Sequence, residues 1–367
     1  HRLPVVAPAE VVAIPGLLAE VDRLAEEGIA ERKMPGCVIA AGYRGQLFLL
    51  RAYGHSSLQP DARPMETTTV FDLASITKPV ATATCMMHLW ERGYFRLSDR
   101  VSKYIPEFAA NGKGDVTIQQ LFTHTSGLIP DNSIRDYANG KAEALQKIYD
   151  LSLRAEPAAK FMYSDVGFIV LGDLVERISG LDVHAYSQKH LYGPAGMTET
   201  GYQPAEALKQ RAAVTEQRNG KWTQGEVHDP RSYAMGGIAG HAGLFSTAQD
   251  LAIYAQMMIQ GGAVGDTQIL SPTTVAKMAA AIEVPGATRS LGWDKQSGYS
   301  SNRAESLSPA AFGHGGFTGT VLWIDPELEL FYIFLSNRVH PDGNGSVNHL
   351  AGRIGNVIVA AVSPEEP

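Results

Sequence analysis

A serine and a lysine three positions apart are the residues whose types and spacing point most directly to chemistry. Ser75 and Lys78 stand in residues 71–79, where helical spacing would place the hydroxyl and the ammonium on one face of a first turn. Such a lysine can lower the pKa of the serine hydroxyl, or accept its proton if its own pKa is lowered. The helix N-terminus would favour oxyanion character at Ser75. The bare S-x-x-K pattern also fits a helical serine beside a solvated lysine, because it arises by chance in many proteins.

Motifs for several other kinds of catalysis are absent from the sequence. It has no G-x-S-x-G or H-E-x-x-H motif and no glycine pattern for phosphate or dinucleotide binding. Two cysteines, Cys37 and Cys85, are too few for a disulfide framework and lack the short paired spacing of zinc and redox sites. We expect both to pack as small hydrophobic residues. No cofactor and no catalytic metal are therefore predicted.

Composition indicates the broad class of protein. The chain has 367 residues, of which 44% are hydrophobic and 19% charged, which predicts a compact soluble protein of roughly two domains, or one domain with an insertion. The net charge of −7 argues against nucleic acid as a partner. No apolar run approaches the ~18 residues that span a bilayer. The chain starts at His1 without the charged and apolar regions of a signal peptide, which suggests a trimmed N-terminus.

The elements that must position these side chains can be predicted from the spacing of apolar residues. An amphipathic helix over residues 14–31 opens the chain, and a β-hairpin over 37–53 follows. The helical period then dominates from about residue 67 to residue 260, except for a second hairpin at 211–225 around an Asn-Gly turn. Helices in this part are expected at 75–92, 118–123, 142–153, 166–178, 183–190 and 248–259.

The C-terminal third returns to β-like patterns after a helix near residues 272–281, and ends in an apolar-striped segment at 346–362. Strands are expected at 290–293, 311–314, 319–324 and 328–336. Because the N-terminal and C-terminal strands need one another to make a sheet of stable size, we infer an α+β fold. Its antiparallel sheet would be flanked by terminal helices and would come from residues 1–66 and 270–367, with a mainly helical domain, residues 67–269, inserted between.

Further segments occur in an order that is typical of one family. They are residues 97–106, 117–127, Tyr163-Ser164-Asp165 and Phe312-Gly313-His314-Gly315-Gly316. Together with the Ser75 segment they make the chain, from about residue 34 to the C-terminus, resemble the penicillin-recognising serine hydrolases. This family includes class C β-lactamases, DD-carboxypeptidases and family VIII-type esterases, and the resemblance implies the β-lactamase/transpeptidase-like fold. Residues 227–247 look most like a subgroup associated with bacterial cell-wall metabolism.

The resemblance also implies roles for individual residues. Ser75 matches the nucleophile, Lys78 its activating partner, and Tyr163 the tyrosine that would form a coupled acid–base pair with the lysine. The oxyanion hole would consist of the backbone N–H groups of Ser75 and Phe317. Substrate-binding residues would be Gln120, Asp165, His314, Gly315 and Gly316.

Two positions depart from the family's pattern. Asp165 stands where most relatives have Asn. A carboxylate only accepts hydrogen bonds, whereas an amide also donates them. Asp165 therefore argues against acylamino substrates such as β-lactams and favours a substrate with an ammonium or N–H donor. Alternatively, Asp165 pairs with Lys78 or another lysine and is structural. His314 replaces a lysine, which weakens the positive charge available for a β-lactam carboxylate. Structural alternatives exist for Tyr163, as a buried aromatic bonded to a carbonyl, and for His314, as a satisfied histidine at a strand end.

Several polar residues outside these motifs are further candidates. His228, Asp229 and His241 are of the types that bind metals, but a polar loop that lines or supports the cleft explains them as well. His124 and Ser126 are expected to be structural hydrogen-bonding residues.

These observations predict a metal-independent serine hydrolase that forms an acyl-enzyme at Ser75 and hydrolyses an ester or amide, with β-lactamase-like, carboxylesterase or D-alanyl peptidase activity. The substrate would be a small molecule or related to peptidoglycan. The alternative, which Asp165 keeps open, is a slowly acylated penicillin-binding sensor or a catalytically idle binder of cell-wall fragments. By resemblance to the family we expect a bacterial periplasmic or secreted protein.

Overall fold

A nine-stranded antiparallel sheet built from both ends of the chain organises the protein. The computed structural model describes residues 2–362. The first hairpin, β1 (Gly36–Tyr43) and β2 (Gln46–Ser57), pairs through β1 with β16 (Leu330–Ser336), near the C-terminus. Across the sheet the order is β11 (Ile282–Val284), β12 (Ala287–Arg289), β13 (Asp294–Gln296), β14 (Phe312–Gly316), β15 (Thr320–Asp325), β16, β1, β2 and β3 (Arg63–Pro64). The predicted α+β fold is confirmed.

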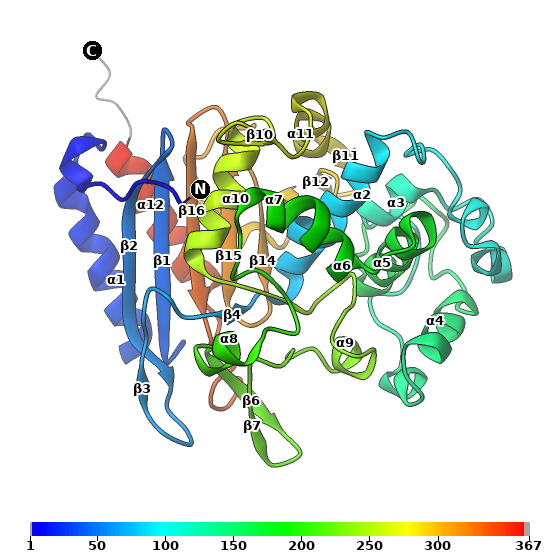
Figure 1. Ribbon diagram of the computed structural model, residues 1–367, viewed down its shortest axis with the longest axis horizontal. Coiled ribbons are helices and arrows are strands. Elements are labelled where there is room, and N and C mark those ends of the chain that lie inside the picture. Colours follow the sequence, from blue (N-terminus) through cyan, green and yellow to red (C-terminus); the bar gives the residue numbers. More distant parts are fainter. Residues whose placement is uncertain (1, 363–367) are drawn as a thin grey trace.

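The two faces of the sheet pack against different helices, because alternate residues of a strand point to opposite sides. In β1, Cys37 and Ile39 belong to one buried cluster together with the terminal helices α1 (Ala19–Ala30) and α12 (Asn348–Val362). Val38 and Ala40 belong to the other cluster, together with α10 (Ala248–Ile259). Figure 1 shows α1, α12 and α10 packed along the sheet. Helix α10 belongs to the predicted insertion, residues 67–269, but packs on the sheet. The predicted end of the helical domain at residue 269 therefore stays a prediction.

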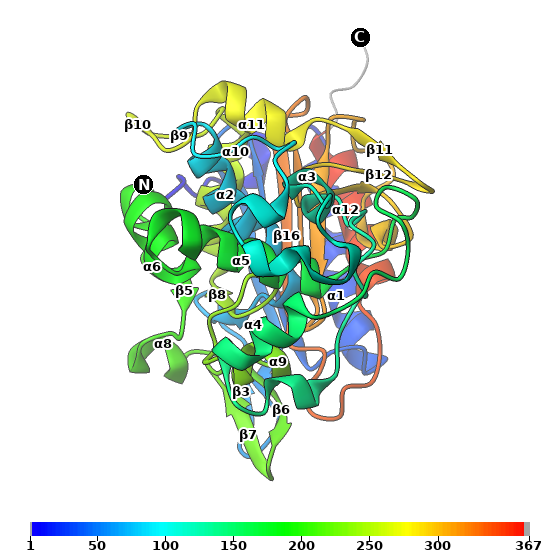
Figure 2. The same ribbon diagram turned by 90° about the vertical axis from the view of Figure 1, so that its right-hand side faces the viewer.

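The region between β3 and β11 is mainly helical, as predicted, and Figure 2 faces it. Its longest helix, α5 (Asp165–Ser179), is buried over residues 166–175 and contacts both α2 (Thr84–Trp90) and α3 (Ile118–Phe122). The remaining elements of this region include α4 (Lys141–Tyr149), α6 (Val183–Ser187), α9 (Pro230–Ala234), the small sheet β4 (Phe71–Asp72), β8 (Leu244–Ser246) and β5 (Gly201–Tyr202), and the hairpin β6 (Val214–Arg218) and β7 (Lys221–Gln224). That hairpin confirms the prediction from the Asn-Gly turn.

The strand predicted at 290–293 is wrong, because those residues form the bend between β12 and β13. Arg289 and Asp294 pair across the bend, and Gly292 has a φ of +89° that favours glycine. A Cβ on Gly292 would lie 2.7 Å from the Cβ of Ala83. The bend therefore packs directly against the helical segment that begins at Lys78.

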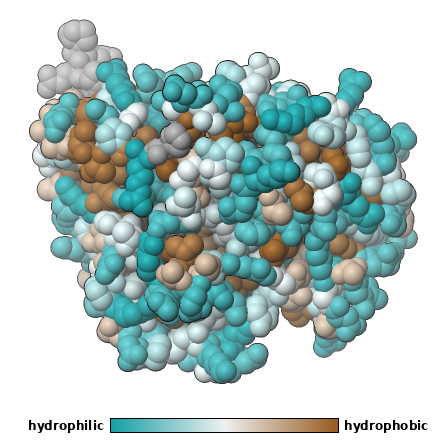
Figure 3. Space-filling model, viewed as in Figure 1, coloured by the Kyte–Doolittle hydropathy of each residue, from teal (hydrophilic) through white to brown (hydrophobic). Residues whose placement is uncertain are grey.

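The remaining sequence expectations concern cysteines and membrane spans. Cys37 and Cys85 are buried and unbonded, as expected for small hydrophobic residues. In the part of the chain that the structure describes, no helix is long and apolar enough to cross a membrane. Hydrophilic residues cover most of the face in Figure 3, and hydrophobic residues form separate patches.

Candidate active site

Ser75 stands on a strained turn that a buried carboxylate holds in place. Strand β4 ends at Asp72, and the helical stretch that carries Ser75 begins at Ala74, which has a φ of +46°, a conformation that is costly for a residue with a side chain. The Asp72 carboxylate accepts hydrogen bonds from the backbone N–H of Ala74, at 2.9 Å, and from that of His228, at 2.6 Å. Sequence analysis missed Asp72, because only the tertiary structure brings residue 228 to it.

Lys78 is buried behind Ser75, where two hydrogen bonds and an ion pair within the protein surround its ammonium. It begins a π-helical turn, η4 (Lys78–Ala83), and none of its side chain is exposed. Its Nζ donates to Ser75 Oγ at 2.9 Å and to the carbonyl oxygen of His241 at 3.1 Å, and lies 2.6 Å from Asp165 Oδ1. The pairing of Asp165 with Lys78 is the structural alternative that the sequence left open for this carboxylate.

Tyr163 completes the cluster from the N-terminal end of α5. Lys78 Nζ lies 5.0 Å from the centre of its ring. On another side the ring stacks on His124, with centroids 4.4 Å apart and planes 29° from parallel. His124 is buried and its Nδ1 accepts a hydrogen bond from the backbone N–H of Ser164, so it fixes the residue that follows Tyr163. The structural role expected for His124 is therefore also a positioning role.

The charges of the cluster follow from its contacts. Burial acts to lower the pKa of Lys78, but the attraction of Asp165 and of Tyr163 outweighs burial and holds that pKa above its usual value. Burial raises the pKa of Tyr163, and the Lys78 ammonium opposes this effect. At neutral pH the resting pair is thus an ammonium at Lys78 and a neutral phenol at Tyr163.

Strand β14 carries the third motif against the turn that holds Ser75. A Cβ on Gly316 would lie 2.4 Å from the carbonyl oxygen of Leu73, so no larger residue fits without moving the strand. Two hydroxyl groups from the segment that follows β14 also hold the turn. Thr318 Oγ1 donates to the carbonyl of Asp72 at 2.7 Å, and Thr320 Oγ1 donates to that of Leu73 at 3.0 Å. These contacts support the predicted oxyanion hole at Ser75 and Phe317, which stays a prediction.

His314 is neutral in this setting. Burial, followed by the positive charges of Arg289 and Lys78, lowers its pKa to about 3. Its Nδ1 lies 2.7 Å from the carbonyl oxygen of Gly315 and so carries the proton. Nε2 is then an acceptor, and it is buried without a hydrogen-bond partner. His314 can therefore accept a substrate hydrogen bond, but it does not supply the charge of the lysine that it replaces.

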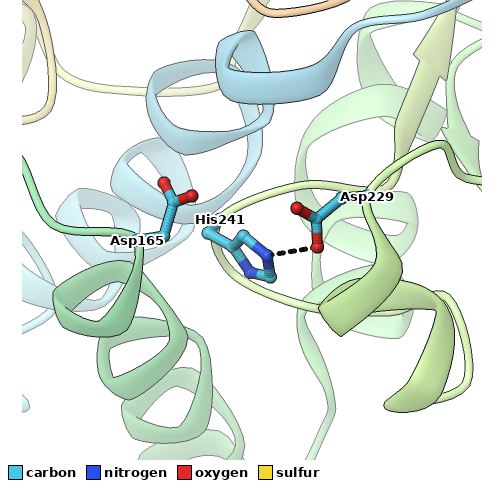
Figure 4. A group of neighbouring side chains, drawn as sticks. All are labelled: Asp165, Asp229 and His241. Atoms are coloured by element: carbon cyan, nitrogen blue, oxygen red, sulfur yellow. Dashed lines mark hydrogen bonds and ion pairs between the residues drawn. The ribbon is translucent and has the colours of Figure 1, made fainter. Parts of the chain in front are cut away.

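The loop before and after α9 places a histidine between two carboxylates. His241 Nε2 lies 2.8 Å from Asp229 Oδ1, and one ligand atom each of Asp165, Asp229 and His241 lies within 4.8 Å of the others (Figure 4). His241 holds the pKa of Asp229 below its usual value against the effect of burial. His228 pairs instead with Glu216 at 2.8 Å. Because Lys78 already occupies Asp165 and the Ser232 N–H occupies Asp229, the cluster fits the polar-loop interpretation.

A cleft of about 1140 Å³ contains Ser75 and most of the predicted site residues in its wall. Two exposed aromatic residues flank it, Tyr299 at 54% exposure and Phe317 at 61%. The predicted site residues in its lining are Ser75, Tyr163, Asp165, His314, Gly315, Gly316 and Phe317. Gln120 is not among the lining residues, because its Oε1 accepts from the Thr117 N–H in the cap of α3. The structure does not support a substrate contact by Gln120.

Curated relatives of the chain are named as a carboxypeptidase and an amidase. It is 32% identical over 329 residues to a protein of Escherichia coli K12 named "Putative D-alanyl-D-alanine carboxypeptidase", covering 81% of this chain and 76% of that protein. It is 31% identical over 389 residues to the N-acetylmuramyl-L-alanine amidase of Bacillus subtilis 168, covering 94% and 88%.

Solved structures show the same fold at lower identity. A class C beta-lactamase matches with a TM-score of 0.78 at 16% identity, covering 96% of this chain and 98% of that one. EstCE1, a hydrolase with promiscuous acyltransferase activity, matches with a TM-score of 0.75 at 21% identity, covering 93% and 98%. The family model described as Beta-lactamase matches residues 21–355. The chain therefore belongs to the beta-lactamase family of serine hydrolases.

Proposed function

We propose that this protein hydrolyses an ester or amide through an acyl-enzyme at Ser75. One observation carries the proposal: Ser75 Oγ lies 2.9 Å from the ammonium of Lys78, in the wall of a cleft that Tyr163 also lines. A nucleophile, a buried cation and a phenol in mutual contact are what acyl transfer to serine requires.

The reactive form of the pair has released the phenol proton to solvent, so that Tyr163 is a phenolate beside the Lys78 ammonium. In the acylation step, Ser75 Oγ attacks the carbonyl carbon of the substrate while its proton passes to the phenolate oxygen of Tyr163. Lys78 remains protonated and stabilises the negative charge shared between these two oxygens, because a buried cation is strongly felt at short range. The tetrahedral oxyanion accepts hydrogen bonds from the N–H groups of Ser75 and Phe317. When the bond to the leaving group breaks, Tyr163 returns the proton to the departing nitrogen or oxygen.

Deacylation reverses these roles with water in place of the leaving group. Water attacks the acyl carbon, its proton passes to Tyr163, and the proton returns to Ser75 Oγ as the acid product is released. The cleft remains large enough for water to enter beside a bound acyl group, since its volume is about 1140 Å³.

Amides and esters related to peptidoglycan are the substrates we propose. The carboxypeptidase and amidase names of the relatives support this class. Such substrates lie outside the cytoplasm of bacteria, so we propose a periplasmic or secreted protein.

Replacement of Ser75 by Ala tests the proposal. The S75A variant should lose hydrolysis of p-nitrophenyl butyrate and labelling by a fluorophosphonate, while S102A keeps both, since Ser102 does not line the cleft and donates to the Gly114 carbonyl. Near-normal turnover by a correctly folded S75A variant would show that Ser75 is not the nucleophile.

A slowly acylated sensor of penicillins or cell-wall fragments is the second candidate. The pairing of Lys78 with Asp165 favours it, because a lysine held as an ammonium is not itself available as a base. Mass spectrometry after mixing with a penicillin and with p-nitrophenyl butyrate separates the two functions. A lasting adduct without turnover indicates the sensor, whereas a burst followed by steady product release indicates the hydrolase.

A further inference from the structure

The carbonyl oxygen that accepts a hydrogen bond from Lys78 belongs to a residue whose side chain is fixed separately. His241 lies between α9 and β8, in the wall of the cleft that contains Ser75, and its side chain is 1% exposed. Its backbone oxygen lies 3.1 Å from Lys78 Nζ. Its ring nitrogen Nε2 lies 2.8 Å from Asp229 Oδ1 (Figure 4). One residue thus contacts a buried cation through its backbone and a carboxylate through its side chain.

The chemistry of the two side chains gives the direction of the bond between them. Although burial acts to raise the pKa of Asp229, His241 holds that pKa below its usual value, so the carboxylate is ionised at neutral pH. A carboxylate only accepts hydrogen bonds, and His241 Nε2 is therefore the donor. Asp229 is itself fixed, because it caps the start of α9 and accepts from the Ser232 N–H at 2.7 Å. The His241 ring is thus tied to an anchored group.

The segment that carries this carbonyl has few side chains that can fix its path. Residues 236–243 are four glycines, two alanines, an isoleucine and His241. Three of these glycines have a positive φ, and glycine loses more conformational freedom on folding than any other residue. Since alanine and isoleucine side chains form no hydrogen bonds, the bond from His241 to Asp229 is the one side-chain hydrogen bond that this segment can supply itself.

Hydroxyl groups from outside the segment hold the carbonyls on either side of that of His241. Thr82 Oγ1 donates to the carbonyl of Gly240 at 2.7 Å, and Ser232 Oγ donates to that of Ala242 at 2.9 Å. The carbonyl of His241 is left to Lys78. Because a side chain in a staggered rotamer fixes the direction of its Cα–Cβ bond, anchoring the ring also restricts the peptide group that carries this oxygen.

The direction of the Lys78 ammonium depends on this carbonyl. Its other partners are Ser75 Oγ at 2.9 Å and Asp165 Oδ1 at 2.6 Å. A lysine ammonium has three N–H donors at the end of a flexible stem, so the loss of one acceptor leaves it freer to rotate and to shift. A shift of about 1 Å in a positioned group can lower a rate about 100-fold. The carbonyl of His241 therefore bears on how Lys78 faces Ser75.

We propose that Asp229 and His241 form a positioning pair for Lys78, in which the bond from His241 Nε2 to Asp229 fixes the carbonyl that aligns the lysine with Ser75. This inference rests on the proposed function, because the expected change in rate presupposes Ser75 as the nucleophile. The competing explanation is that His241 Nδ1, which is buried without a hydrogen-bond partner, acts on the substrate as a base.

Two replacements of His241 separate these explanations. H241Q keeps an N–H donor close to the place of Nε2 but has no counterpart of Nδ1, whereas H241L has neither nitrogen. With p-nitrophenyl butyrate, H241L should lower kcat about 30-fold and change KM less than about threefold, and H241Q should keep kcat within about threefold of wild type. Equal losses of kcat in the two variants would overturn the positioning role and favour Nδ1 as a base.

Replacements of Asp229 examine the other member of the pair. D229N keeps an oxygen acceptor and should keep kcat within about fivefold, whereas D229A removes the acceptor and should match H241L. The H241L/D229A protein should be no more than about threefold slower than H241L, because both changes break one bond. D182A is the matched control, since Asp182 caps α6 through the Ala185 N–H and is not among the residues that line the cleft. A D229A protein with wild-type kcat would contradict the proposal.

Crystal structures of the variants separate this inference from the proposed function. The distance from Lys78 Nζ to the carbonyl oxygen of residue 241 should exceed 3.5 Å, the limit of a hydrogen bond, in H241L and should be unchanged in H241Q. D229A, which removes the same bond, replaces H241L if that protein does not fold. An unchanged distance in the variant without the bond would overturn the inference, whether or not the wild-type protein is a hydrolase. Hydrolysis that persists in S75A would contradict the proposed function alone.

Discussion

Lys78 and Arg289 are both fully buried cations beside the same cleft, but the regions around them differ in how the protein pairs them. The ammonium of Lys78 contacts Ser75, Asp165 and a backbone carbonyl. The guanidinium of Arg289 has one ion pair, with Asp294, and its Nε and Nη2 are buried without a hydrogen-bond partner. A cation whose contacts are complete is held in one position, which suits the alignment of a nucleophile. A cation with unpaired donors is suited to bind a ligand that completes them.

This difference teaches that burial alone does not identify a catalytic charge. The partners of Lys78 all come from the protein, so its charge is fixed before a substrate arrives, as electrostatic preorganisation requires. The unpaired nitrogens of Arg289 can contribute binding free energy only when a ligand is present. The hydrogen bonds that form at that point replace no hydrogen bond within the protein. The two regions should therefore respond differently to substitution.

The largest effect is expected from K78M, which removes the fully paired cation. We expect kcat for p-nitrophenyl butyrate to fall on the order of 10⁴-fold, because nucleophile, cation and phenol act as a unit. Steady-state kinetics of the folded variant measure the loss. A kcat within about tenfold of the wild-type value would show that the paired cation does not align the nucleophile.

G316A is expected to have the next largest effect, because Gly316 lies where β14 meets the nucleophile turn. The added Cβ would approach a backbone oxygen at 2.4 Å, so the strand must move away from Ser75, and a displacement of this kind costs about 100-fold in kcat. G114A is the matched control, since nothing lies within 4 Å of its added Cβ. Steady-state kinetics of both variants at equal folded concentration give the comparison. A G316A rate within a few-fold of wild type would mean that the strand edge does not position the reaction.

D165N sharpens the comparison by leaving Lys78 in place with fewer partners. Asp165 holds the pKa of Lys78 above its usual value, so the ammonium persists to high pH. Removing the carboxylate lowers that pKa, and the alkaline limb of the kcat profile should move to lower pH by about one to three units, with about a tenfold lower maximum. A pH–rate profile of both proteins measures the shift. If neutral Lys78 were the active form, the rate would instead rise with pH through the lysine pKa, and this rising limb would lie at lower pH in D165N than in the wild-type protein.

The smallest effect is expected from Y299A, at the contact between the two regions. Tyr299 touches Tyr163 on one side and Phe161, the ring below Arg289, on the other. Because it is half exposed, its loss should change the free energy of unfolding by less than about 0.5 kcal/mol, and should lower kcat about threefold. Y94A, at a tyrosine of similar exposure outside the cleft lining, should leave kcat unchanged. Urea unfolding and kinetics of the two variants provide the measurements.

Much of the fold followed from local patterns in the sequence. The hairpin at β1 and β2, the helix α10 and the hairpin at β6 and β7 were predictable because periodicity and turn residues act over a few neighbours. The bend at 290–293 was not, because its form depends on Gly292 packing against Ala83. The strand-like composition of residues 290–293 does not reveal that a helical segment distant in the sequence packs against them.

The residues proposed to be catalytic could be singled out for a similar reason, and Arg289 could not. Ser75 and Lys78 are three residues apart, and Tyr163 belongs to a short motif in a recognisable order. Arg289 has no motif around it. Its importance depends on two nitrogens that lack partners, and a sequence does not show which hydrogen bonds remain unmade.

The sequence by itself determined the kinds of chemical group available, their order along the chain and the alternation that builds the sheet, because these properties depend on neighbouring residues. Only the tertiary structure decided the charge of Lys78, the neutrality of His314 and the unpaired nitrogens of Arg289. Each of these depends on burial and on partners from distant segments, and electrostatic interactions in a protein interior are set by distances in space and not by positions in the chain.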